Sequence, residues 1–142
     1  MSITAANALI TLAVESVFPN AVQIQGFAAD DLFDAEDMEI VETLMGVDGY
    51  LSAGYVNVPF NMNISLQADS LSNFLFDQWF AAQRAAQDVF AADGEIVLPS
   101  IGTSTILSNG YLVKYKPVAD AKKLLQPRKY MIRFNSNQPI PL

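Results

Sequence analysis

The stretch VNVPFNMNISLQ, residues 56–67, carries the clearest structural signal in the sequence. Its apolar and polar side chains alternate without a break, so that Val56, Val58, Phe60, Met62, Ile64 and Leu66 share one face, and Asn57, Asn61, Asn63 and Ser65 share the other. This period of two predicts a half-buried β-strand with an uncharged polar face. At about 3.3 Å per residue the strand would extend roughly 40 Å, twice the usual length. We therefore expect it either to bend at Pro59 or to project beyond the body.

A long helix is predicted directly after this strand, over about residues 70–92. Asp69 and Ser70 are typical N-cap residues, and Asp93-Gly94 is a typical stop. The apolar positions are Leu71, Leu75, Trp79, Ala82, Ala86 and Val89, widened by Phe74, Phe76, Phe80 and Phe90. This face exceeds the roughly 100° that a surface helix needs, so the helix should pack on two sides. We expect a neighbouring subunit on the second side, with Phe76, Trp79 and Phe80 at the interface; the alternative is a loop of the same chain.

Shorter strand signals surround these two elements. They cover residues 9–17, 22–26 after a turn at Pro19-Asn20, 38–45 before a turn at 46–49, 95–98, 103–107 and 111–116 on either side of an Asn109-Gly110 turn, and 129–135. The tail, residues 135–142 with Pro139 and Pro141, is expected to be an extended arm. Strands on both sides of one helix, without βαβ alternation, predict an α+β, mainly β fold. We expect one domain over residues 1–142, an antiparallel β-sandwich or barrel flanked by one long helix.

The composition argues against most enzyme classes. The chain has 142 residues and neither Cys nor His. It therefore has no thiolate nucleophile, no imidazole base and no Cys or His ligand for zinc. The acidic run at 30–37 lacks the glycine and the spacing of a calcium loop, and nothing marks a catalytic carboxylate pair. We predict no enzyme and no catalytic, metal or cofactor site.

Low charge indicates a surface that a partner covers. Only 16% of the residues are charged, against about 25% in an average domain, while 51% are hydrophobic. A small protein with so few charges usually buries part of its exterior in an assembly. Residues 1–14 lack a basic segment, and no apolar run is long enough for a membrane span. We therefore expect a soluble protein made in a cytoplasm, without a membrane partner.

The net charge of −7 is divided unevenly along the chain, which has no Lys or Arg before Arg84. An acidic loop, residues 28–37, holds Asp30, Asp31, Asp34, Glu36 and Asp37. A basic segment, residues 114–133, holds Lys114, Lys116, Lys122, Lys123, Arg128, Lys129 and Arg133 against Asp120 alone. If the fold separates the two regions, copies can contact one another head to tail and form rings or stacks. The alternative is that the two regions pair within one subunit.

Several motifs in the second half of the chain resemble those of a known family. They are Ile64 to Ser70 (ISLQADS), Phe76 to Trp79 (FDQW), Glu95 to Ser100 (EIVLPS), Ser108-Asn109-Gly110 and Leu125 to Tyr130 (LQPRKY). Together they resemble tail tube proteins of contractile-tailed bacteriophages, relatives of type VI secretion tubes. The first half matches only in its layout.

The resemblance implies a structural virion protein. Such proteins form hexameric rings that stack into the hollow inner tube of the tail, the conduit for DNA ejection, with sheath, baseplate and tape-measure proteins as partners. Assembly would take place in the bacterial cytoplasm, and the lumen would be acidic or neutral so that DNA passes without specific binding. Asn57, Asn61, Asn63 and Ser65 are then the candidate lumen face. The acidic loop and the basic segment are candidate contacts between rings or with the sheath.

Two rival functions remain open at this point. One is a baseplate or tail-terminator protein of the same fold, which would form one ring and stop. The more distant one is a small-molecule-binding β-barrel.

Overall fold

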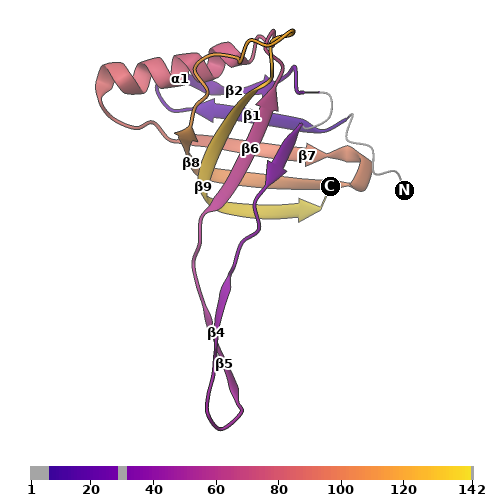
Figure 1. The fold of residues 1–142 in the computed structure, drawn as a ribbon, viewed down its shortest axis with the longest axis vertical. Helices are drawn as coiled ribbons and strands as arrows, with labels where there is room; N and C mark the ends of the chain where they lie inside the picture. The colour runs from indigo at the N-terminus through magenta and orange to yellow at the C-terminus, as the bar shows by residue number, and fades with distance from the viewer. Residues whose placement is uncertain (1–6, 29–31, 142) are drawn as a thin grey trace.

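The computed structural model describes residues 7–28 and 32–141. Their elements are β1 (Leu9–Val14), β2 (Phe18–Ile24), β3 (Phe33–Ala35), β4 (Val41–Met45), β5 (Leu51–Tyr55), β6 (Phe60–Leu66), α1 (Asn73–Ala86), β7 (Ala92–Leu98), a 3-10 turn (Pro99–Ile101), β8 (Thr103–Lys114) and β9 (Arg128–Pro141). Seven strands form one antiparallel sheet in the order β2-β1-β7-β8-β9-β6-β3, and β4 and β5 form a separate hairpin (Figure 1). The mainly β fold with one helix is confirmed; the sheet is open and not a closed barrel.

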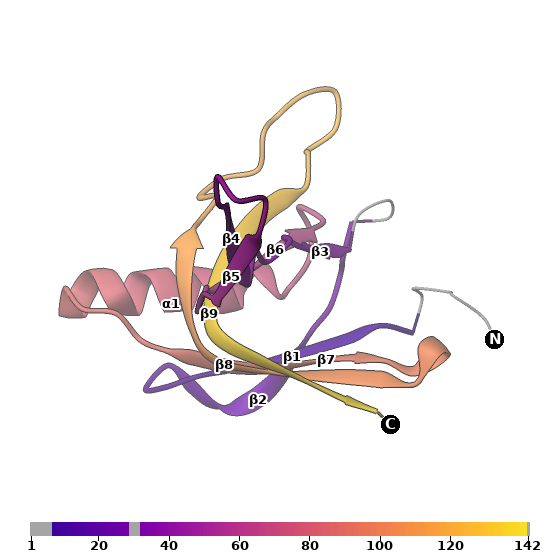
Figure 2. The same ribbon diagram turned by 90° about the horizontal axis from the view of Figure 1, so that it is seen from below.

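The sheet is folded along its two longest strands. The first half of β8 pairs with β7 and with the second half of β9, whereas the first half of β9 pairs with β6. In Figure 2, β1, β2 and β7 lie in one layer, β9 and β6 rise away from it, and α1 lies in the angle between the two layers. This arrangement gives a sandwich-like core without closing the sheet.

A bulge in β8 accompanies this fold. Asn109 has a φ of 51°, and the register between β7 and β8 shifts at this point. A Cβ on Gly110 would lie only 2.4 Å from Cε1 of Phe134. The hairpin turn expected at Ser108-Asn109-Gly110 is therefore wrong. Asn109 instead supplies a left-handed residue, and Gly110 supplies a position without a side chain, where the strand bends around the Phe134 ring.

The core lies between the two layers and the helix. The Phe76 ring stacks on Tyr130 with 4.1 Å between centroids, and the Trp79 indole donates a hydrogen bond to the Phe90 carbonyl at 3.1 Å. The apolar face predicted for residues 60–66 is confirmed, because Phe60, Met62, Ile64 and Leu66 are buried there. Within the described residues, no helix combines the length and the apolar character needed to cross a bilayer.

The helix is shorter than the predicted range of 70–92. It ends at Ala86, and Gln87 adopts a left-handed φ of 52°. The amide of Phe90 donates to the Gln83 side chain at 3.1 Å, so the chain turns back along α1. At the other end, the Ser70 hydroxyl donates to the Gln25 carbonyl at 2.6 Å and ties the start of the helix to the end of β2. Asp93-Gly94, expected to stop the helix, lies inside β7.

Three further expectations differ from the structure, the first two because sheet edges tolerate proline. Pro19-Asn20 is not a turn but lies in the edge strand β2; the turn precedes it, at Ser16 with a φ of 66°. The tail is not a free arm, because residues 135–141 pair with β8 on one side only. Within the acidic loop, Phe33–Ala35 forms the edge strand β3, which pairs with β6.

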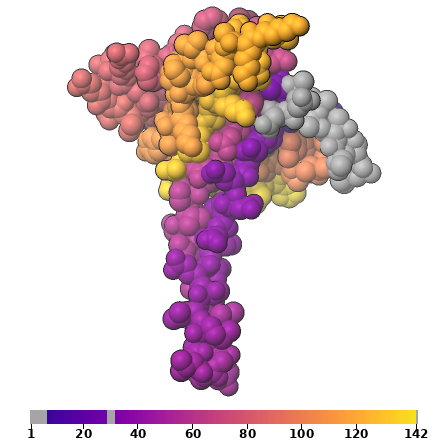
Figure 3. All heavy atoms as spheres, viewed as in Figure 1, coloured from indigo at the N-terminus to yellow at the C-terminus, as the bar shows by residue number. Residues whose placement is uncertain are grey.

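The β4–β5 hairpin projects from the body as a stalk (Figures 1 and 3). The strand predicted for residues 56–67 begins only at Phe60, directly after Pro59, and residues 56–59 lead into it from the hairpin. The predicted turn at 46–49 is confirmed. The overlong pattern therefore marks two elements, a core strand and a projecting connection.

Candidate interaction surfaces

The stalk hairpin, residues 41–55, exposes several large apolar side chains. Every residue of β4 and β5 is exposed. Val41 pairs with Tyr55 and Met45 pairs with Leu51, so these four side chains share one face, each of them 47 to 79% exposed. Leu44 lies on the opposite face and is 75% exposed. A two-stranded hairpin is marginal in water by itself, so this one needs a partner on at least one face.

The tip of the stalk hairpin is ordered by its own backbone and is acidic. The Gly46 amide donates to the Tyr50 carbonyl at 2.9 Å, and the Tyr50 amide donates to Asp48 Oδ1 at 3.2 Å. Gly49 supplies the positive φ of 86° that the turn requires. Residues 36–55 contain Glu36, Asp37, Glu39, Glu42 and Asp48, and no Lys or Arg. The projecting segment therefore combines apolar side chains with negative charge.

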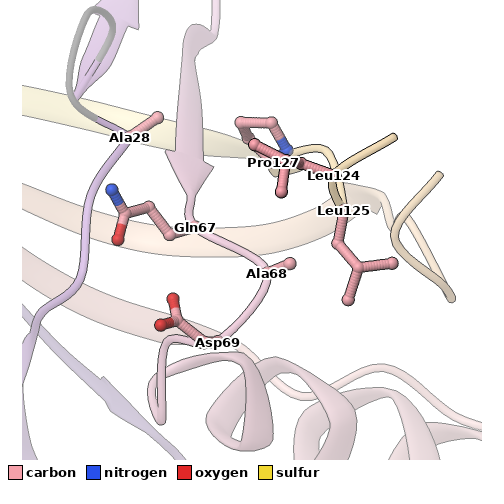
Figure 4. A pocket seen from close by; sticks show the side chains of 7 residues that line it. All are labelled: Ala28, Gln67, Ala68, Asp69, Leu124, Leu125 and Pro127. Atoms are coloured by element: carbon pink, nitrogen blue, oxygen red, sulfur yellow. The ribbon is translucent and has the colours of Figure 1, made fainter. Parts of the chain in front are cut away.

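An apolar hollow lies at the other end of the molecule. Leu124, Leu125 and Pro127 line one side of it, and Ala28, Gln67 and Asp69 line the other (Figure 4). Its volume is about 520 Å³. Leu124 and Leu125 are 76% and 63% exposed. The hollow is therefore a second apolar surface that the rest of the described chain leaves open.

Two lysines stand beside this hollow. The Lys122 amide donates to the Leu124 carbonyl at 3.3 Å, and the Gln126 amide donates to the Asp120 carbonyl at 2.9 Å. This tight turn presents Lys122 and Lys123 next to the exposed leucines. Both lysines are exposed, and neither forms an ion pair with any residue that the structure describes.

The polar face of β6 is basic rather than neutral. Asn61, Asn63 and Ser65 do share a face, as predicted, whereas Asn57 lies outside the strand. The register places Lys129 beside Ser65 and Arg133 beside Asn61, and Lys114 lines the same shallow pocket as Asn63. Asn63 donates to Asp34 Oδ1 at 2.7 Å, and Arg133 donates to Asn61 Oδ1 at 2.8 Å. Three cations thus face one carboxylate in this part of the described chain.

Arg128 departs from the expectation for the basic segment. It is 8% exposed, and its guanidinium donates to Asp77 Oδ1 at 2.9 Å and to the Lys116 carbonyl at 3.0 and 2.8 Å. Burial alone would raise the pKa of Asp77, but hydrogen bonds from Arg128 and Tyr115 and the Arg128 charge outweigh it and lower that pKa. Arg128 is therefore an internal staple and not a contact for another subunit.

The helix residues expected at an interface are also mostly internal. Phe76 and Trp79 are 1% and 0% exposed and belong to the core of their own chain. Phe80 is 37% exposed and stacks on Tyr115 with 4.4 Å between centroids. The exposed aromatic residue of α1 is Phe74, at 63%. The helix thus buries one side, and the predicted interface at Phe76 and Trp79 is corrected.

The acidic loop and the basic segment are not paired within the described residues. The ion pairs in that part of the chain are Arg128–Asp77 and an exposed pair, Lys116–Asp120, at 3.0 Å. Glu36 and Asp37 lead into the stalk, and Asp34 lies on β3. The contacts predicted at Asp30 and Asp31 fall outside the described residues. No group of three or more carboxylates suited to a metal ion occurs among the residues that are described.

The stalk hairpin is the surface that sequence reasoning missed, because it was predicted only as a strand and a turn. A usable signal was present. Leu44 and Met45 before the turn, Val47 within it, and Tyr50 and Leu51 after it place large apolar side chains on both faces and at the tip. In a hairpin that is buried on one face, apolar and polar residues would alternate along each strand.

A family model described as tail fiber protein gp32 matches residues 1–138 of the chain. A comparison with curated proteins found no significant match. Among solved structures, a chain from the anti-feeding prophage baseplate is similar with a TM-score of 0.60 and 16% identity, over 99% of this chain and 98% of that one.

Two further structures are equally similar. A chain of the sheath/tube terminator of an extracellular contractile injection system gives a TM-score of 0.63 at 11% identity, over 99% and 97% of the two chains. A chain of the anti-feeding prophage tube-terminating cap gives 0.61 at 10% identity, over 100% and 93%. At these identities the likeness establishes a shared fold. The chain therefore shares its fold with these chains of a baseplate, a terminator and a cap.

Proposed function

The chain belongs to the family described as tail fiber protein gp32, which makes it a structural protein of a tail, and from this premise we propose that it assembles with copies of itself. The copies form hexameric rings, and the rings stack into the hollow inner tube of a phage tail, the conduit for DNA ejection. In this role the chain performs no catalysis.

The stalk hairpin is the observation that carries this proposal. Its two strands expose Leu44, Met45, Leu51 and Tyr55 by 61 to 79%. Exposed apolar surface of this extent on a monomer is unfavourable and typically marks a site of protein association. Because the stalk stands clear of the body, as Figure 3 shows, another molecule must cover it.

The partners follow from this role. Besides its own copies, we propose the tail sheath, the baseplate and a tape-measure protein as neighbours, and the virion tail as the location after assembly in the host cytoplasm. The similar structures come from baseplate, cap and terminator assemblies. They support a place in such an assembly.

For the lumen, the face with Asn61 and Asn63 remains our candidate, whereas Ser65 is only 5% exposed and offers little surface to a channel. With Lys114, Lys129 and Arg133 on the same face, a channel built from it is basic. We therefore expect DNA to be held there weakly, without sequence preference and with strong dependence on salt. This replaces the earlier expectation of an acidic or neutral channel.

A single-ring protein of the baseplate or terminator is the second candidate function. It is favoured by the kinds of assembly in which the similar chains occur. Such a protein would form one ring and stop.

Electron microscopy of the purified protein tests the proposal and separates the candidates. Long tubes are the expected result. Single closed rings would favour the terminator or baseplate role, and monomers at high concentration would contradict self-assembly in either form. The stalk variant described in the Discussion shows whether the hairpin is the element responsible.

A further inference from the structure

The stalk hairpin and the apolar hollow lie at opposite ends of the molecule. In Figure 1 the long axis is vertical, with the hairpin at its lower end and the segment around residue 120 at its upper end. Figure 3 shows the same two regions as the extremes of the molecular surface. A projecting element at one end and a recess at the other have the geometry of head-to-tail contacts. Such contacts extend into stacks, because each copy keeps one free projection and one free recess.

The two surfaces share their apolar chemistry. The tip of the hairpin presents Leu44, Val47 and Tyr50, each at least 75% exposed. The hollow presents Leu124 and Leu125 beside Ala28, Ala68 and Pro127. Its volume, about 520 Å³, accommodates several side chains of this size. Seating one surface on the other would remove the exposed apolar side chains of both from water.

The two surfaces are also complementary in charge. Glu42 and Asp48 lie on the hairpin, where no cation accompanies them, and Lys122 and Lys123 directly precede Leu124, which lines the hollow. Among the described residues that line the hollow, Asp69 is the one carboxylate. The lysines lack an ion-pair partner among the described residues, so an incoming carboxylate does not have to displace one. Complementary charge of this kind steers two surfaces into register.

We propose that the tip of the stalk hairpin, residues 44–51, docks in the hollow beside Leu124 and Leu125 of a second copy, with the hairpin carboxylates Glu42 and Asp48 next to Lys122 and Lys123. The inference rests on the proposed self-assembly and names the two surfaces that make the contact. The alternative occupant of the hollow, a different tail protein, becomes an outcome of the test.

Disulfide cross-linking suits this chain because it contains no cysteine. We would mix Val47→Cys chains with Leu124→Cys chains under mild oxidation and analyse them on a non-reducing gel. The expected product is a covalent dimer, and a chain that carries both substitutions should give a ladder of oligomers. The matched control replaces Leu124→Cys with Val89→Cys, which is 61% exposed and outside both surfaces. It should give little product.

The outcomes distinguish this inference from the proposed function. Stacked rings in the microscope without a ladder would overturn the docking and leave self-assembly intact. Equal products with Val89→Cys would overturn it too, because random collision would then explain the bond. If Val47→Cys remains reactive to maleimide inside assembled tubes, the hairpin is free for another protein, which also contradicts the docking. If the chain forms neither assemblies nor cross-links, both proposals are contradicted.

A charge variant supplies a second, independent readout. Lys122→Glu/Lys123→Glu should slow formation of the Val47–Leu124 cross-link by about tenfold at low salt, because electrostatic steering of the hairpin is lost. At about 0.5 M salt the difference from the parent should nearly vanish, because the charges are screened. Unchanged rates at low salt would show that these lysines do not face the incoming hairpin. Adding Glu42→Lys to the partner chain should restore part of the rate.

Discussion

Arg128 and Asp77 join the last strand to the helix through a contact of 2.9 Å between Nη2 and Oδ1. Arg128 also lies over the rings of Tyr115 and Tyr130, at 5.7 and 5.4 Å from their centroids. The pair therefore ties the start of β9, just after the segment that carries Leu124 and Leu125, to α1.

Removing the carboxylate should destabilise the monomer. In Asp77→Asn, the buried guanidinium keeps the Lys116 carbonyl but loses its counter-charge. We expect a loss of about 1–2 kcal/mol in the free energy of unfolding, at the low end for a buried charge because Asp77 is partly exposed. Urea denaturation measures it. The matched control is Asp120→Asn, which breaks the exposed pair with Lys116 and should cost less than about 0.5 kcal/mol. Equal losses of unfolding free energy in the two variants would contradict a stabilising role of the Arg128–Asp77 pair.

The same pair predicts a dependence on pH. The pKa of Asp77 lies below its ordinary value of 3.8 in the folded chain, so folding favours the charged form. The stabilisation is fully present above the unfolded pKa and is lost as the pH falls through the folded pKa, below 3.8. The difference in stability between the parent and Asp77→Asn should therefore be constant from pH 7 to about 5 and shrink below about 4. Urea midpoints across this range test it, and a difference that grows or stays constant as the pH falls from 5 to the lowest value at which the parent still folds would contradict it.

The bulge in β8 should not accept a side chain. In Gly110→Ala, the new Cβ would meet the Phe134 ring at 2.4 and 2.5 Å, so the ring must move within the core. We expect a loss of about 1–3 kcal/mol, the usual cost of overpacking. Gly54→Ala is the matched control, because nothing lies within 4 Å of the Cβ it adds. Thermal unfolding of the monomers should show a lowered Tm for the first variant alone.

Polar substitution of the stalk should separate folding from assembly. Leu44→Ser/Val47→Ser changes two side chains that are 75% and 112% exposed and support no core. The free energy of unfolding should therefore change by less than about 0.5 kcal/mol, whereas assembly is lost. Sedimentation velocity reports the assembly. Val89→Ser, another exposed apolar position, should assemble like the parent. Normal assembly of the double variant would show that these hairpin side chains are not required for assembly.

The proposed lumen can be mapped with one cysteine. In assembled tubes, Asn63→Cys should react with a small maleimide that enters the channel and not with a maleimide attached to a large polymer. Unassembled chains should react with both reagents, which serves as the control. If the large reagent also labels the tubes, the face of β6 with Asn61, Asn63 and Ser65 lies on the outside.

The core and the fold class could be predicted because they depend on local periodicity. Alternation at Phe60, Met62 and Ile64 identifies a buried face regardless of what packs on it. The length of the helix could not be predicted in this way. Residues 87–91 have helical composition, and only the tertiary contacts of Trp79 and Gln83 with Phe90 turn the chain away.

The bulge in β8 and the edge strands of the sheet were predicted wrongly for a related reason. Asn109-Gly110 has the chemistry of a hairpin turn, and the same left-handed backbone serves a bulge when neighbouring strands continue on both sides. Pro139 and Pro141 exclude a central strand but do not exclude an edge. Whether a segment is central or at an edge depends on the order of the strands, which no local pattern contains.

The sign of the charge along the chain singled out Lys122, Lys123 and Arg128 as candidate contacts. The two lysines are exposed, whereas Arg128 turns inward to Asp77, which a charge pattern does not show. Phe76 and Trp79 are aromatic, as interface residues often are, but they lie in the core. Aromatic content alone does not distinguish a core from an interface, because both are apolar.

The mass and shape of the particles that the purified chain forms test the central claim most directly. Electron microscopy with mass photometry should show stacked rings, whose smallest closed unit has a mass of about 93 kDa for six chains of 15.5 kDa. Particles that remain at the mass of one chain at high protein concentration, with no rings in the images, would contradict it.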